Sequence, residues 1–173
     1  MTTLDPLVAP VTPLTVCTEL LQLVESALVS CGSEPLNRVH VAAGAVAWDD
    51  CCGMLVVGPE RIYRSMSFPA EAPEETSCWS GLIALDVVVL LVRCVPVVDN
   101  RGHPPTVPVL DAAYGGFLAD AAIVWNALAS PGLPGEWERA NLNQSFVGAD
   151  GGCIGVETRL TVGIQAGLWG ICP

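Results

Sequence analysis

Hydrophobic side chains recur at helical spacing in two segments of the chain. In residues 12–31 the apolar positions are Val16, Leu20, Leu21, Val24, Ala27, Leu28 and Cys31. Pro13 suits the first helical turn there, and Gly32 suits the end of the helix. Residues 106–129 show the same spacing, although Gly115 and Gly116 weaken the middle. The pattern predicts two helices, the first an amphipathic helix that lies against a sheet.

Strand-like runs fill the first half of the chain between these helices. Glycine and proline separate three short apolar runs, at residues 38–48, 54–57 and 62–68. Residues 36–59 predict a hairpin that turns at residues 49–53. The acidic, proline-containing residues 69–77 have no periodicity and predict a surface loop.

The second half contains the longest apolar run and a second predicted hairpin. Residues 82–95 are rich in valine, which favours a strand, and Pro96 ends the run. Residues 141–148 and 154–164 flank the turn sequence Asp150-Gly151-Gly152. The predicted fold class is α+β: a mostly antiparallel sheet with two helices packed on one face.

Length and composition indicate one folded domain. The chain has 173 residues, of which 51% are hydrophobic and 14% charged, and this excludes a disordered chain. We expect an extended N-terminal arm at residues 1–13, a single α+β domain at 14–166 and a C-terminal segment at 167–173. The arm has no basic residue and no long apolar run, so it does not predict a secretory leader. Residues 82–92 are about half of the roughly 20 residues that span a bilayer, so no membrane contact is expected.

The charge balance argues against binding of nucleic acid. Seven arginines and no lysine stand against 18 acidic residues, which gives a formal net charge of −11. Such a surface repels the phosphate backbone.

Eight cysteines occur without any CxxC pair, so the usual zinc spacing is absent. Asp49, Asp50, Cys51 and Cys52 are adjacent, and neighbouring side chains on a strand cannot all reach one ion. We therefore expect no metal and no cofactor. Cys17 and Cys31 fall on the first predicted helix and are expected to be small buried hydrophobes. The other six could form disulfides of unspecified connectivity; they are Cys51, Cys52, Cys78, Cys94, Cys153 and Cys172.

The sequence contains no recognised catalytic motif, and we expect no enzymatic activity. The alternative is a ligand-binding or enzymatic domain with a site around Cys51, Cys52 and His40. Arg93, on the predicted buried strand, needs a partner carboxylate, either within its own chain or across a subunit interface.

Tryptophans and clustered acids provide the remaining candidates. Trp125 is expected in the core, whereas Trp79 and Trp169 are near loops and could anchor an interface. The acidic cluster Glu71, Glu74 and Glu75 lacks the alternate spacing of a calcium loop and predicts a solvated acidic surface.

Several segments resemble a protein family. They are AGAVAWDDCCGML at residues 43–55, Phe68-Pro69, LVRCVPV at 91–97, GHPPT at 102–106 and GGCIG at 151–155. Together they resemble a head-to-tail neck protein of long-tailed actinobacterial phages, with the tail terminator the most similar. The resemblance covers roughly residues 14–166, and the WDDCCG and RCVP segments are its most specific parts.

This resemblance implies a structural virion protein located at the head–tail joint and assembled in the host cytoplasm. It implies a hexameric ring that ends tail-tube polymerisation and contacts the major tail tube protein and a head-completion or stopper protein. Double-stranded DNA would pass through the lumen without specific binding, with Glu71, Glu74 and Glu75 as lumen or rim acids. The alternative within the same neck is the head-completion or stopper protein itself.

Overall fold

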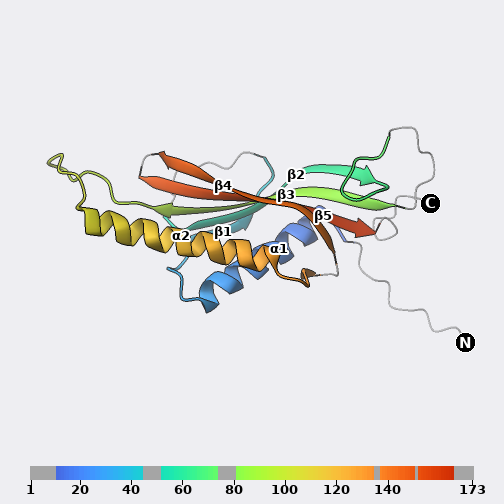
Figure 1. Cartoon of the computed structure of the whole chain (residues 1–173), viewed down its shortest axis with the longest axis horizontal. Helices are drawn as coiled ribbons and strands as arrows, with labels where there is room; N and C mark the ends of the chain where they lie inside the picture. Colours follow the sequence, from blue (N-terminus) through green and yellow to red (C-terminus); the bar gives the residue numbers. More distant parts are fainter. Residues whose placement is uncertain (1–10, 45–51, 74–80, 135–136, 151, 166–173) are drawn as a thin grey trace, which may run out of the picture.

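The protein consists of a five-stranded sheet with both helices on one face (Figure 1). The computed structural model describes residues 11–44, 52–73, 81–134, 137–150 and 152–165. The elements in chain order are α1 (Pro13–Ser30), β1 (Arg38–Val41), β2 (Met54–Ser65), β3 (Leu82–Cys94), α2 (Val107–Ala129), β4 (Glu138–Asp150) and β5 (Cys153–Gln165). The predicted α+β fold with a mostly antiparallel sheet is confirmed.

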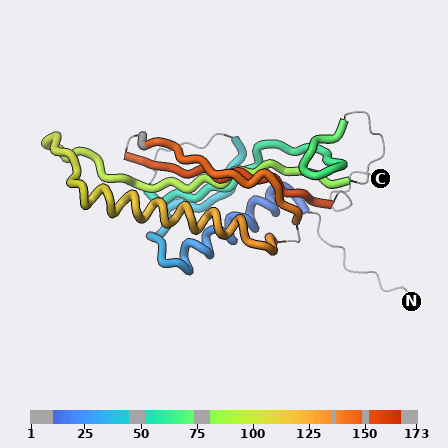
Figure 2. Tube along the Cα trace, viewed as in Figure 1, coloured from blue at the N-terminus to red at the C-terminus, as the bar shows by residue number. Residues whose placement is uncertain are grey.

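The strand order across the sheet is β1-β2-β3-β5-β4, so β3 lies in the centre. β3 pairs antiparallel with β2 on one side and with β5 on the other along its whole length. β4 and β5 form the predicted hairpin, which Figure 2 shows lying beside β3. The valine-rich run at 82–95 is therefore a strand, as predicted, and it lies in the centre of the sheet.

The prediction of a hairpin at residues 36–59 is wrong. β1 runs parallel to β2, with Arg38 opposite Met54 and Val41 opposite Val57. An alternating pattern reports which side of a strand is buried, but it does not report the direction of the strand. The runs at 54–57 and 62–68 also belong largely to one strand, β2, with a register shift between Pro59 and Arg61. Proline cannot donate to the ladder, which explains why the regular pairing is interrupted there.

Helix α1 begins and ends at the residues that its sequence signals indicated. The Thr12 side chain accepts a hydrogen bond from the backbone N–H of Thr15, and Pro13 occupies the first turn. After Ser30 the chain turns at Gly32, whose φ of +75° is the left-handed conformation that glycine tolerates.

The main core lies between the helices and the sheet. β3 contributes every second residue, from Leu85 through Val87 and Val89 to Leu91. The buried stripes of the helices cover these residues; they are Val16, Leu20, Val24 and Leu28 of α1 and Phe117, Ala121, Val124 and Leu128 of α2. A second, smaller cluster contains Met54, Val56, Leu90, Val92 and Cys153.

Candidate functional site

A buried ion pair connects the central strand to α2. Arg93 follows the core residue Leu91 on the helix-covered side of β3, and Asp120 faces it from α2. Arg93 Nε donates to Asp120 Oδ2 at 2.8 Å, and Nη2 contacts the same oxygen at 2.6 Å without hydrogen-bond alignment. Both residues are less than 10% exposed. Such a pair is tolerated in the interior because each charge compensates the other.

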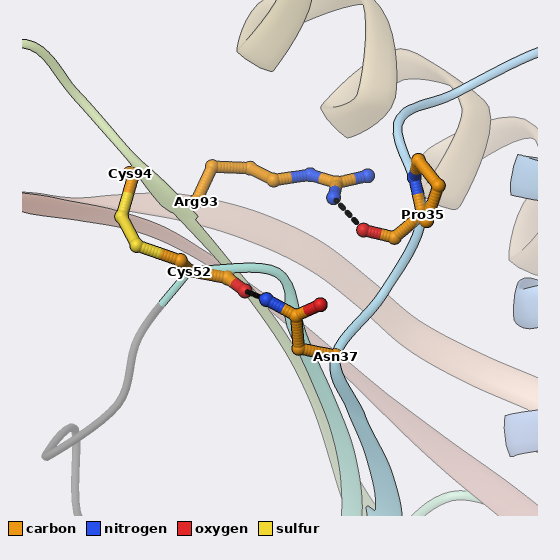
Figure 3. The surroundings of a disulfide bond; sticks show 5 residues. All are labelled: Pro35, Asn37, Cys52, Arg93 and Cys94. Carbon is orange, nitrogen blue, oxygen red and sulfur yellow. Dashed lines mark hydrogen bonds between the residues drawn. A yellow bond between two sulfur atoms is a disulfide. The ribbon is translucent and has the colours of Figure 1, made fainter.

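The same pair holds the turn that follows α1. Ser33 Oγ donates to Asp120 Oδ1 at 2.6 Å, and Arg93 Nη1 donates to the Pro35 carbonyl at 3.4 Å (Figure 3). Three elements far apart in sequence therefore meet at one guanidinium group. Of the two partners expected for Arg93, the structure contains the internal one, Asp120.

A disulfide lies next to this ion pair. Cys52, just before β2, is bonded to Cys94 at the end of β3, with their Cα atoms 4.7 Å apart (Figure 3). Asn37 Nδ2 donates to the Cys52 carbonyl and so ties the start of β1 to the same place. Cys153 is disulfide-bonded as well. Three of the six cysteines proposed for disulfides are thus confirmed, and Cys51, Cys78 and Cys172 lie outside the described residues.

The disulfide bears directly on the alternative catalytic site around Cys51, Cys52 and His40. The Cys52 sulfur is bonded to Cys94, so it cannot act as a thiolate nucleophile. His40 is half-buried on β1. Within the described ranges, no group of three or more histidine, cysteine or acidic side chains could hold a metal ion.

The two remaining described cysteines differ in their surroundings. Cys17 is buried in α1, and burial raises the pKa of its thiol to about 11. Cys31 is exposed, which contradicts the expectation that both are buried. Cys31 is the C-terminal cap of α1, one turn beyond the last buried position at Leu28.

A cavity of about 540 Å³ lies between the end of α1, the end of β3 and α2. Its lining includes Cys31, Ser33, Arg93, Phe117, Asp120 and Ile123. Arg93 and Asp120 neutralise each other there, and the exposed Glu34 just after α1 adds a carboxylate to the lining.

A second polar network lies on the other side of β3, around Asp86. Asp86 Oδ1 accepts a hydrogen bond from Thr161 Oγ1 at 2.7 Å, and Oδ2 accepts one from Arg61 Nε at 3.1 Å. The Arg61 guanidinium also lies over the Tyr63 ring, 4.2 Å from its centre. Burial, followed by the nearby Asp86 charge, raises the pKa of Tyr63.

The acids proposed for a lumen or rim can be placed only in part. Glu71 is exposed and forms an ion pair with Arg61 at 3.1 Å. Glu74 and Glu75 lie outside the described residues. Arg159 is likewise paired, with Glu60 at 3.2 Å and with Glu157 at 3.0 Å.

Of the tryptophans singled out from the sequence, Trp79 and Trp169 lie outside the described residues. Trp125 was expected in the core, but it is 36% exposed on the outer side of α2. The core stripe of that helix passes through Val124 and Leu128 instead. Because neighbouring residues on a helix point in different directions, Trp125 is exposed although Val124 is buried.

The sequence analysis did not identify Asp86 and Asp120 as partners in these networks. Both are single acids inside strongly apolar segments, which is a usable signal, because a charge is kept in such a place only when it is paired. The identity of each partner was not available from the local sequence.

No family model matches this chain, and no curated protein matches it.

Proposed function

We propose that this chain is a structural subunit of a phage virion, a tail terminator that assembles as a hexameric ring. The ring ends polymerisation of the tail tube and provides the joint for the filled head. The sequence resemblance supports this assignment, and so does the α+β fold with its helices on one face.

The observation that carries the proposal is the open edge of the sheet at β4. This 13-residue strand is last in the strand order, and within the described sheet it pairs with β5 alone. The outer backbone groups of an edge strand are a template for a strand from another chain. An assembly subunit uses such an edge to continue its sheet into a neighbour, whereas a monomeric protein has to protect it.

The distribution of charge supports passage of DNA through the ring. Arg61, Arg93 and Arg159 are all engaged in ion pairs, and Arg139 donates to the carbonyls of Leu128 and Ser130. These internal contacts occupy four of the seven arginines of a chain that already carries a net charge of −11. A negative lumen repels the DNA backbone and lets it slide.

The test compares two targets, purified tail tubes made of the major tail protein and DNA-filled heads that lack tails. We expect the protein to form a ring, in solution or on the tube end, and to stop further growth of the tube. Native mass and electron microscopy of tube lengths measure both. Binding to heads with no effect on tubes would assign the chain to the head-completion or stopper role instead. A monomer that binds neither target would overturn the neck assignment.

The lumen acids provide a second, site-specific test. Changing Glu71, Glu74 and Glu75 to arginine should lower phage titre while the ring still assembles. A control with the same charge change elsewhere, Glu19, Glu25 and Glu34 to arginine on α1 and the turn after it, should have less effect. Equal titres for the two variants would show that these three acids do not line the DNA path.

A further inference from the structure

We propose that the outer face of α2 is the surface against which a second copy of this chain packs. The inference rests on the proposed ring, because it assigns the contact between one subunit and the next. We call this surface the α2 face, and define it as Val107, Tyr114, Leu118 and Trp125 of α2 together with Phe146 of β4.

The α2 face is an apolar row with one exposed carboxylate, Asp111, between Val107 and Tyr114. Its four helical members are spaced seven, four and seven residues apart, which places them along one side of the helix. They are 68%, 37%, 54% and 36% exposed, in chain order, and Phe146 is 56% exposed. Phe146 packs edge to face against Phe117 of α2, with ring centres 6.0 Å apart, so it belongs to the same surface.

The size of this surface fits a subunit contact. Aromatic side chains offer about 150–250 Å² each, so five large side chains exposed to this extent present several hundred Å². The largest apolar patch on a typical monomer is about 300–600 Å² and is often functional. A standard interface takes about 800 Å² from each partner, which the α2 face can provide together with its rim.

Charge also favours a second copy at this place. Two chains that each carry a net charge of −11 repel one another over most of their surfaces. α2 has no basic residue and two acids: Asp120, which is paired with Arg93, and Asp111, which is exposed on the same side of the helix as the α2 face. The α2 face thus has one carboxylate beside five large apolar side chains, so two copies repel each other less there than over an acidic part of the surface.

A membrane is the competing partner for such a helix. By length and composition alone α2 could cross a bilayer, and only 22% of its apolar window is buried. Its Phe117, Val124 and Leu128 side chains, however, belong to the core of the domain. Helices that lie on membranes also present lysine and arginine on their polar face, and α2 has neither.

The decisive variant is Leu118→Glu with Trp125→Glu, which puts two charges on the α2 face without touching the core. Its control is Val29→Glu with Ile62→Glu, which changes two exposed apolar residues on α1 and β2. Native mass, tube capping and flotation with anionic lipid vesicles are measured for both and for the wild type. Circular dichroism checks that each variant is folded.

We expect the α2 variant to lose the ring, with subunit affinity reduced at least tenfold, and the control to keep it. A ring that persists in the α2 variant would overturn this inference and leave the proposed function intact, as would equal loss of the ring in the control. A wild-type chain that stays monomeric and ignores tubes would overturn both. Vesicle binding by a monomeric wild type would assign the α2 face to a membrane and overturn the inference.

Discussion

Two ion pairs begin on the same strand, β3, and differ in almost every physical respect. Arg93 points toward the helices and meets Asp120 with both side chains about 90% buried. Asp86, seven residues earlier, points to the opposite face and meets Arg61, which is half exposed. An odd number of residues along a strand separates the two, which is why they lie on opposite faces.

One strand therefore places one ion pair in the interior and another near the surface. On the helix side, both side chains are about 90% buried and each charge has one counter-charge. On the other side, Asp86 shares its charge among Arg61, Thr161 and Tyr63, and solvent screens it. Breaking the first pair should therefore lower the free energy of unfolding strongly, whereas breaking the second should change it little.

The largest effect is expected from breaking the buried pair. Asp120→Asn leaves the Arg93 guanidinium buried without a counter-charge and should lower the free energy of unfolding by about 3–5 kcal/mol. Urea unfolding of wild type and variant measures it. The double variant Arg93→Met with Asp120→Leu should recover most of the loss, since it removes both charges. A loss below about 1 kcal/mol for Asp120→Asn would show that water reaches the pair.

Removal of the neighbouring disulfide should have the next largest effect. Cys52 and Cys94 close a loop with a sequence separation of 42, so replacing both by serine should cost about 2–4 kcal/mol by releasing the unfolded chain. Urea unfolding under non-reducing conditions is the measurement. Cys31→Ser, at an exposed thiol, is the matched control and should stay within about 0.5 kcal/mol of the wild type. Equal stabilities for the two variants would contradict a stabilising role for the disulfide.

The surface pair should contribute much less. Asp86→Asn keeps an oxygen for the Thr161 hydroxyl and removes only the charge opposite Arg61, so the change in the free energy of unfolding should not exceed about 1 kcal/mol. The same urea series measures it beside Asp120→Asn. If Asp86→Asn destabilised the protein as much as Asp120→Asn, the different burial of the two ion pairs would not determine their contributions to stability.

The smallest effect concerns ionisation of Tyr63. Because its pKa is raised above the ordinary value of 10, the folded state keeps the phenol proton at a pH where the unfolded chain has begun to lose it. The stability contributed by the neutral phenol is present below pH 10 and is lost as the pH rises through the pKa of the folded state. The difference in ultraviolet absorbance between wild type and Tyr63→Phe should give a midpoint above pH 10.

Asp86 supplies only the second cause of that shift, after burial. In the Asp86→Asn background, the Tyr63 midpoint should therefore fall. An unchanged midpoint would show that the Asp86 charge does not act on the Tyr63 phenol.

The sequence predicted those elements whose pattern is local. The buried stripe and end signals of α1 gave its limits to within a residue or two, and the valine run predicted the strand β3. The turn at residues 150–152 indicated the β4–β5 hairpin. In each case the period of the side chains and the residues at the ends are sufficient, because they act over a few residues.

Tertiary structure decided which of these elements meet and with which faces. The parallel pairing of β1 with β2, the exposure of Trp125 and the choice of Asp120 as the partner of Arg93 all depend on contacts between distant segments. A local pattern reports which side of an element is apolar, but it does not report what lies opposite. Period and termini were therefore determined by the sequence alone, whereas strand direction, ion-pair partners and the uncovered α2 face were set by packing in three dimensions.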